Sequence, residues 1–302
     1  MSLYCQYKYV VISKIKMYPI MKRLALFFFL ISLCTLAGAQ DFALPKVSVS
    51  ENGFKGPVKS VREYWVATTS DIEDNSDDRP YWIPDSICYL FSAYGSLVEE
   101  KYRARYEAEV AHYVYNSLGR LVADTCKSSE DGFHVHVYVY DSLGRISCVE
   151  IYFVEIDDTL TPIDTICLDY DEAGRVTARH DSFGNTVRYY YDKHGRLERE
   201  VSNENCYDTY RYNKNGRKVE HVIRFWHKTF TYTYRYDKYG NTVKEIIKDQ
   251  DTQSGSEMSR NILDYHYTEY DKYGNWLKGI LTAKIGVNVY HFDIRRKITY
   301  LF

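Results

Sequence analysis

The segment YVYDSLGR, residues 138–145, contains the elements from which the fold can be predicted. Tyr138 and Tyr140 alternate with a valine, which places both rings on one face of a strand. Asp141 can accept hydrogen bonds from amides further along the chain, and this favours a type I turn. Gly144 supplies the positive φ that closes a short hairpin loop with a bulge. The arginine that follows begins the returning strand, where it could lie over a neighbouring tyrosine ring or reach the turn carboxylate.

This turn pattern, Asp or Asn followed by Gly at the fourth position and Arg or Asn at the fifth, occurs eight times. Seven copies have Tyr directly before the Asp or Asn, and the exception has His180. A degenerate copy at residues 90–95 opens the series. Repetition of this kind marks an array of similar units. The predicted structural turn residues are Asn116, Gly119, Asp141, Gly144, Asp171, Gly174, Asp181, Gly184, Asp192, Gly195, Asn213, Gly216, Asp237, Gly240, Asp271 and Gly274.

The spacing of the turns predicts how many strands the array contains. Four of the eight steps between successive turn glycines are 21 to 25 residues long, which fits two strands, one conspicuous turn and one less conspicuous turn. Around Gly184 the steps shorten to 10 and 11, so there the pattern itself occupies the less conspicuous turn. Segments such as 133–140 and 230–236 alternate and are rich in Val, Tyr and Phe, whereas no window shows a helical stripe. We predict an all-β fold of about fifteen to eighteen antiparallel strands, in a strongly twisted sheet curled into an open trough or partial shell.

The N-terminal region reads as an export signal. Lys22 and Arg23 form a positive n-region, residues 24–36 are apolar, and residues 37–39 are a small-residue cleavage site. We interpret residues 1–20 as a gene-model extension, 21–39 as a signal peptide, 40–88 as N-terminal strands with an acidic loop, and 89–302 as the hairpin array. The apolar stretch is short for a membrane span. We therefore expect an exported protein, periplasmic, secreted or on the outer surface, with no transmembrane span after cleavage.

Composition excludes several function classes. Lys+Arg 39 against Asp+Glu 41 gives a net charge of −2, which provides no basic field for nucleic acid. Removal of the first forty residues takes away five basic and no acidic side chains, so the net charge falls to about −7. With 45% hydrophobic residues and 26% charged residues, the chain is folded rather than disordered. The 32 tyrosines suit half-buried strands.

Five cysteines follow the predicted signal peptide, at positions Cys88, Cys126, Cys148, Cys167 and Cys206. An odd number cannot pair completely within the chain, and the spacings match no zinc pattern. Either all five are small apolar residues on strands, or some of them form one or two cross-strand disulfides. The sequence does not determine which cysteines would pair.

Neither metal binding nor catalysis is predicted. His134 and His136 share a strand face and His112 is near in sequence, but no carboxylate or cysteine stands at a fixed spacing to complete a metal site. The acidic residues Asp71, Glu73, Asp74, Asp77 and Asp78 lack the order of a calcium loop. There is no nucleophile elbow, zinc-protease motif or phosphate loop, and turns account for the abundant aspartates. We predict no catalytic residues, no metal, no cofactor and no enzymatic activity.

The full unit Y-x-Y-D-x-x-G-R resembles the signature of the YD-repeat, or Rhs-repeat, family. The resemblance covers residues 89–302 and extends towards Gly53. Large members form hollow β-shells around a C-terminal toxin, and teneurin-type relatives act in cell adhesion; such repeats are also described as carbohydrate-binding. The family's shell-closing core has an Asp-Pro motif, whereas the last proline here is Pro162. At this length the resemblance therefore implies neither toxin delivery nor a closed cocoon.

Three functions remain open at this stage. The first is a non-enzymatic, exported protein with a binding or scaffolding role at the cell envelope, where its partner is an unidentified protein or carbohydrate. The second is a carbohydrate-binding module that uses tyrosine and tryptophan faces. The third is an accessory or remnant of an Rhs-type toxin-delivery system. The tyrosines have an alternative role, because cross-strand tyrosine pairs also stabilise neighbouring hairpins.

Overall fold

The computed structural model describes residues 46–70, 83–104, 107–128, 132–155 and 159–301. These residues form eighteen antiparallel strands and no helix. The strands are β1 (Val58–Ser70), β2 (Ser86–Phe91), β3 (Leu97–Ala104), β4 (Glu107–Tyr115), β5 (Leu121–Ser128), β6 (Gly132–Tyr140), β7 (Ile146–Val154), β8 (Leu160–Tyr170), β9 (Val176–His180), β10 (Thr186–Tyr191), β11 (Leu197–Asn203), β12 (Cys206–Tyr212), β13 (Lys218–Phe225), β14 (Lys228–Tyr236), β15 (Thr242–Asp251), β16 (Glu257–Tyr270), β17 (Trp276–Ile285) and β18 (Asn288–Tyr300).

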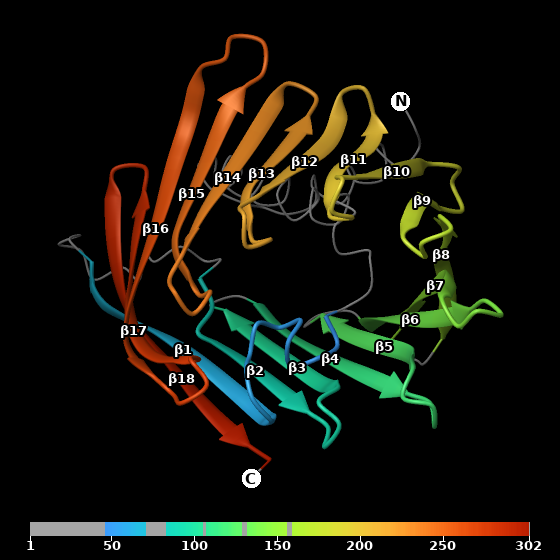
Figure 1. Ribbon diagram of the computed structural model, residues 1–302, viewed down its shortest axis with the longest axis horizontal. Helices are drawn as coiled ribbons and strands as arrows, with labels where there is room; N and C mark the ends of the chain where they lie inside the picture. Colours follow the sequence, from blue (N-terminus) through green and yellow to red (C-terminus); the bar gives the residue numbers. More distant parts are fainter. Residues whose placement is uncertain (1–45, 71–82, 105–106, 129–131, 156–158, 302) are drawn as a thin grey trace. The chain divides into compact units, whose positions relative to one another are not determined.

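The strands follow one another as a meander, because each strand pairs with the next along the chain. The predicted all-β hairpin array is therefore confirmed. In addition, β1 pairs with β18 in a register that runs from Val58 opposite Tyr300 to Ser70 opposite Tyr290. The sheet thus closes into an eighteen-stranded barrel, and Figure 1 looks into the ring that its strands form.

The prediction of an open trough or partial shell was wrong. It treated the segment around β1 as a strand that leads into the array, whereas β1 joins the first and last hairpins. Closure of a sheet depends on strand number, twist and stagger rather than on total chain length. Closure also removes both free edges, whose unpaired backbone groups would otherwise be exposed.

Two apolar clusters flank the closing pair of strands. One contains Trp276, Leu281 and Phe292 from β17 and β18, and the other contains Phe54, Val61 and Leu97. Between them, Arg296 of β18 forms an ion pair with Glu63 of β1 at 2.5 Å, and both side chains are almost fully buried. The Arg296 guanidinium also lies 3.8 Å from the centroid of the Trp276 ring. The seam is therefore closed by a buried charge pair set between packed side chains.

Along the strands, buried and exposed side chains alternate. In β10, Val187 and Tyr189 are buried while Arg188 and Tyr190 are exposed. This is the period of two expected for a sheet with one buried face. The first tyrosines of the repeated pattern belong to the buried face, as Tyr138 and Tyr210 illustrate.

The cysteines adopt more than one state. Cys148 of β7 and Cys167 of β8 are opposite each other in the register and form a disulfide. Cys88 and Cys206 are not disulfide-bonded. The side chain of Cys126 lies outside the described part of the structure. No stretch of the described residues forms a helix of the length and apolarity that a membrane span requires.

We expect Glu63→Gln to destabilise the protein by about 3 kcal/mol, because it leaves the buried Arg296 charge without its partner. Urea denaturation measures this loss as a lower transition midpoint with an unchanged slope. Glu257→Gln, which removes an exposed ion pair with Arg260, is the matched control and should change the free energy of unfolding by less than about 1 kcal/mol. Equal effects of the two substitutions would contradict the role given to the seam pair.

Candidate functional site

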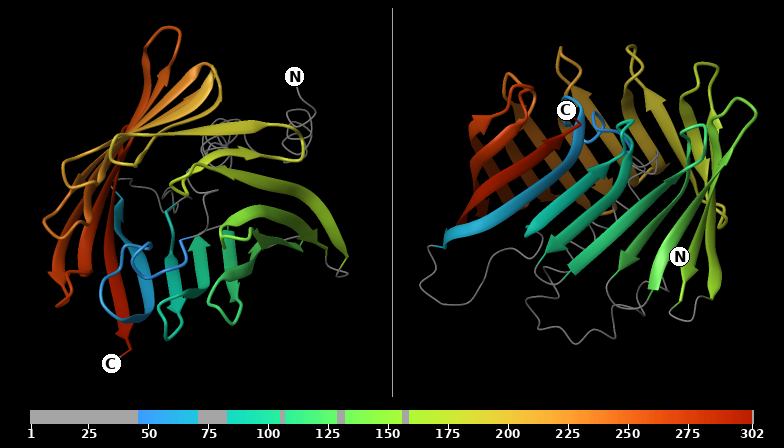
Figure 2. Two further views of the ribbon diagram at one scale, coloured as in Figure 1. Left: turned by 45° about the vertical axis from the view of Figure 1, so that its right-hand side comes forward. Right: turned by 90° about the horizontal axis from the view of Figure 1, so that it is seen from below.

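The turns of the repeated pattern gather at one end of the sheet. Because the strands form an antiparallel meander, every turn that follows an even-numbered strand lies at the same end. The right-hand view of Figure 2 shows these turns along the upper edge. We call this edge the motif rim; it comprises the turns at residues 92–96, 116–120, 141–145, 171–175, 192–196, 213–217, 237–241 and 271–275. The copy at 181–185 joins β9 to β10 and lies at the opposite end.

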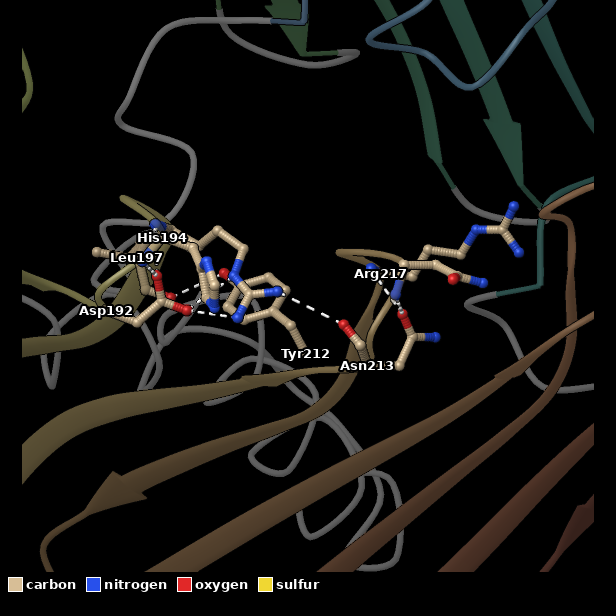
Figure 3. A network of polar contacts seen from close by, with 8 residues as sticks. Asp192, His194, Leu197, Tyr212, Asn213 and Arg217 are labelled. Atoms are coloured by element: carbon tan, nitrogen blue, oxygen red, sulfur yellow. Dashed lines mark hydrogen bonds and ion pairs between the residues drawn. The ribbon is translucent and has the colours of Figure 1, made fainter.

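Each turn is closed by its first residue. In the turn at Asp192, the carboxylate Oδ1 accepts hydrogen bonds from the amides of His194 at 2.8 Å and Arg196 at 2.9 Å (Figure 3). The Gly195 amide donates to the Asp192 carbonyl at 2.9 Å, and Gly195 has a φ of 75°. The turn residue at position one and the glycine at position four therefore act together. All eight glycines of the pattern have positive φ, namely Gly119, Gly144, Gly174, Gly184, Gly195, Gly216, Gly240 and Gly274.

The tyrosine before each turn links it to the preceding turn of the rim. The Tyr212 hydroxyl donates to the carbonyl of Leu197, two residues after the glycine of the previous turn (Figure 3). The same bond recurs with O–O distances of 2.6 to 2.8 Å. The pairs are Tyr115 to Leu97, Tyr140 to Leu121, Tyr170 to Ile146, Tyr191 to Val176, Tyr212 to Leu197 and Tyr236 to Lys218. We call this contact the tyrosine bridge.

Burial keeps these hydroxyls protonated. It raises the pKa of Tyr115 to about 12, with smaller contributions from the nearby carboxylates of Glu51 and Asp124. A protonated phenol is the required donor, because a carbonyl oxygen can only accept a hydrogen bond. Each bridge contributes about 1 kcal/mol to stability, and the six bridges together link seven consecutive turns of the rim.

The arginine at position five covers the bridging tyrosine of the next turn. When the turn begins with Asp, the guanidinium is also bound by that carboxylate, as Arg196 Nε is by Asp192 at 2.7 Å. In these turns the guanidinium carbon lies 4.5 to 4.8 Å from the centroid of the tyrosine ring. In the two turns that begin with Asn, the distance is 5.5 Å for Arg120 and 5.7 Å for Arg217. The carboxylate thus holds the arginine over the ring, and an amide at the same position does not.

In the two rim turns that end with Asn rather than Arg, the carboxylate takes over the next tyrosine. Tyr270 Oη donates to Asp237 at 2.9 Å, and Tyr300 Oη donates to Asp271. The Asn275 amide donates to the same Asp271 carboxylate at 2.9 Å. With the shorter asparagine at position five, one carboxylate oxygen therefore accepts from both the asparagine amide and the neighbouring phenol. Tyr300 lies on β18, so this variant connects the last hairpin to the closing strands.

His180 takes the place of tyrosine in the one copy outside the rim. Its ring binds Asp169 at 2.8 Å and Thr186 at 3.0 Å, instead of a carbonyl of a preceding rim turn. The exception in the sequence thus coincides with the one turn at the opposite end of the sheet.

The side chains at the tips of the rim turns, at positions two and three, make none of these hydrogen bonds and vary in chemistry, although the rings of Tyr239 and Tyr273 pack against Tyr270 and Tyr300. Tyr94, Leu118 and Leu143 occupy position three of consecutive turns and are 96%, 76% and 74% exposed. Lys193, Lys214, Lys238 and Lys272 occupy position two of four consecutive turns, and all four are exposed. Sequence reasoning assigned no role to these residues. The signal was present as Asp or Asn directly followed by Lys in the last four rim turns, but only the fold places those turns side by side.

Buried ionisable side chains line the other candidate region, the buried face of the strands. Asp124 accepts hydrogen bonds from His136 at 2.9 Å and from Tyr138. On β12 and β13, Asp208 binds His221 at 2.7 Å, and the His221 ring stacks between Tyr210 and Tyr232. These carboxylates orient imidazoles, yet the flanking side chains are tyrosines that are themselves bound or stacked. Sequence reasoning missed both pairs, because their members lie 12 and 13 residues apart on different strands.

The other candidates from the sequence are dispersed. The His134 ring packs at a tilt against Phe153, 5.3 Å between centroids, and burial followed by the charge of His136 lowers the pKa of His134. His112 faces Thr125 in the register, so it lies on the opposite face from His136. The acidic residues 71–78 lie outside the described residues. Within the described ranges, no group of three or more His, Cys, Asp or Glu side chains could hold a metal ion.

Residues 170–205 match the family model described as RHS Repeat. The matched segment includes the turns at Asp171, Asp181 and Asp192, and it confirms the resemblance drawn from the repeated pattern. No curated protein matches the chain.

Several solved structures are similar to this chain, and the Tc toxin structures among them align over less than a fifth of their own length. The crystal structure of TcdB2-TccC3-TEV aligns with a TM-score of 0.34 and 13% identity, over 66% of this chain and 12% of that chain. The Tc holotoxin pore of Photorhabdus luminescens aligns with a TM-score of 0.24 and 10% identity, over 74% and 17%. A porin-like protein from Bacteroides uniformis aligns with a TM-score of 0.39 and 13% identity, over 81% and 98%. At these TM-scores the likenesses establish no shared function.

We expect Gly195→Val to lower the free energy of unfolding by at least about 1 kcal/mol, since a β-branched residue is strained at positive φ. The only atom near an added Cβ is Arg175 Nη1 at 3.7 Å, so the loss reports backbone strain rather than a clash. Gly195→Asn is the control, because Asn tolerates this conformation better. Thermal melting that finds the Val variant as stable as the Asn variant would contradict the turn assignment.

Glu245 should make stability depend on pH between its ordinary pKa of 4.5 and about 7, because burial raises its pKa to about 7 against the opposing charge of Lys218. The protonated form suits the folded state, so its contribution is full below pH 4.5 and is lost as the pH rises through about 7. Chemical denaturation across this range should show a weaker pH dependence for Glu245→Gln. Glu269→Gln, at an exposed ion pair with Lys278, should retain the parent profile; a Glu245→Gln profile identical to the parent would exclude the assignment.

Proposed function

We propose that this protein is an exported, non-enzymatic binding scaffold of the cell envelope, built from Rhs-type repeats. The observation that carries the proposal is that different positions of each rim turn form the framework and the tip. Positions one, four and five, together with the preceding tyrosine, make the contacts that hold the rim. Positions two and three differ from turn to turn, and all of them except the half-buried Tyr273 are exposed. A rigid framework with variable exposed loops is the general design of binding proteins.

The absence of an enzymatic role is supported by the surroundings of the buried Asp–His pairs. Catalysis by such a pair usually needs a serine or cysteine within hydrogen-bond reach of the imidazole. In the described strands, His136 and His221 are bound by their carboxylates and are accompanied by tyrosines. These pairs therefore serve the packing of the buried face.

Export is supported by the sequence of residues 21–40, which reads as a signal peptide, and by the cross-strand disulfide between Cys148 and Cys167. Disulfides persist in oxidising compartments. The RHS Repeat match at residues 170–205 supports an Rhs-type association, without deciding between a scaffold and an accessory of a toxin-delivery system.

Carbohydrate binding through stacked aromatic faces receives less support. The exposed aromatic side chains include Tyr94 on the motif rim, Tyr190 on a strand, and Phe183 and Trp226 at the opposite end. They are spread over both ends of the sheet, whereas sugar stacking requires neighbouring rings. A glycan array on the purified protein separates the two proposals, since binding by an aromatic face should be lost in Trp226→Ala or Tyr190→Ala.

Fractionation of cells that express the full chain tests the proposal. We expect the protein in the envelope fraction, with an N-terminus produced by cleavage near Gln40. A variant with serine at Leu118, Leu143, Lys193 and Lys214 should fold and be exported but should leave the envelope fraction for the soluble exported fraction. Val287→Ser, at an exposed turn of the opposite end, is the control and should behave as the parent. Retention of the signal peptide, or equal envelope association of all variants, would overturn the proposal.

A further inference from the structure

The exposed tips of the motif rim form two arcs of different chemistry. The apolar arc consists of Tyr94, Leu118 and Leu143, on the turns β2–β3, β4–β5 and β6–β7. The basic arc consists of Lys193, Lys214, Lys238 and Lys272, on the turns β10–β11, β12–β13, β14–β15 and β16–β17. Only the turn at Glu172 and Ala173 separates them along the sheet. All these side chains therefore point from one rim.

The basic arc contrasts with the charge of the whole chain. The net charge is −2, yet four consecutive rim turns carry lysine at the same position. Neighbouring rim turns are two strands apart, so the lysines follow one another at about 10 Å. The rim arginines over tyrosine rings are already held within the sheet, whereas the lysines are exposed at the tips. The arc thus presents a row of positive charge on a protein of opposite sign.

The fold does not require the apolar side chains of the apolar arc. Positions two and three of such turns ordinarily carry polar residues, because they face solvent. Leu118 and Leu143 remain 76% and 74% exposed, and Tyr94 is 96% exposed, so they contribute little to the core. Three such side chains on consecutive turns form a patch rather than isolated exceptions.

We propose that the motif rim docks on an anionic lipid surface. The lysines of the basic arc would lie among the anionic headgroups, and the tips of the apolar arc would enter the interface between headgroups and acyl chains. A leucine or tyrosine at the end of a rigid turn can enter that interface without rearrangement of the sheet. This inference rests on the proposed envelope-binding role and names its partner.

A lipid surface accounts for both arcs, and this distinguishes it from other partners. A linear polyanion would engage the basic arc but would leave the leucines in water. An apolar protein partner would cover Leu118 and Leu143 without using the lysines on the other side of the rim. A second copy of the chain, whose net charge is −2, would make the protein oligomeric.

Co-sedimentation of the purified exported protein with phospholipid vesicles tests the proposal. We expect binding to mixed phosphatidylcholine–phosphatidylglycerol vesicles, little binding to pure phosphatidylcholine, and weakening with added salt. Lys193→Gln combined with Lys214→Gln should weaken binding about 25-fold, since each lysine near an anionic surface contributes about fivefold. Lys101→Gln combined with Lys284→Gln removes the same charge from the strands and should weaken binding less than about threefold.

The apolar arc is tested by Leu118→Ser combined with Leu143→Ser, which should also reduce vesicle binding, while Val287→Ser at the opposite end should not. Urea denaturation confirms that all variants remain folded. If the leucine variant binds vesicles as the parent does, and immobilised dextran sulfate captures both proteins equally, the partner is a polyanion rather than a lipid surface. If the parent sediments as a dimer and the lysine variant as a monomer, the rim binds a second copy of the chain. Absence of vesicle binding by a parent that still fractionates with the envelope would overturn this inference and leave the proposed function standing.

Discussion

The tyrosine bridge is the contact on which the arrangement of the sheet depends. Strand pairing joins each strand to its neighbours along their length, and the tyrosine bridge adds a side-chain contact between consecutive turns at the rim. In each bridge, the phenol donates to the carbonyl two residues after the glycine of the previous turn. The O–O distance of this hydrogen bond is 2.6 to 2.8 Å, and the bond holds consecutive turns in a fixed relation. The arginine over the ring adds a cation–π contact to the bridge.

The variation between repeats follows from the same contact. When position one is Asp and position five is Arg, the carboxylate holds the guanidinium over the next ring, as in Asp192 and Arg196. When position one is Asn, the arginine lies further from the ring. Arg217 still donates to the carbonyl of Asp237 at 3.3 Å, as Arg196 does to the carbonyl of Asn213 at 3.5 Å. When position five is Asn, the next tyrosine binds the carboxylate itself. Three combinations of residues at positions one and five therefore hold the tyrosine of the next turn in three different ways, and the rim remains continuous.

The rim contacts leave the turn tips free to carry function. None of the bonds that close a turn uses the side chains at positions two and three, so Ser-Leu, Lys-His and Lys-Tyr occur there on the same backbone geometry. This separation explains how a repeat can be strict in its framework and variable in its surface chemistry. It also explains why the repeated pattern, read alone, says more about the fold than about the partner.

The sequence by itself determined the hairpins and the residues of the repeated turns, and it limited the number of strands to about fifteen to eighteen, because an acceptor at position one and a glycine at position four act within five residues. The exceptional place of His180 was also visible, although its reason was not. Closure of the sheet was decided only in the tertiary structure: β1 and β18 are more than two hundred residues apart, and neither the pairing of Glu63 with Arg296 nor the buried Asp–His pairs leave a local pattern. The arcs of the rim likewise exist only in space, because a meander brings together tips that the sequence separates by two strands.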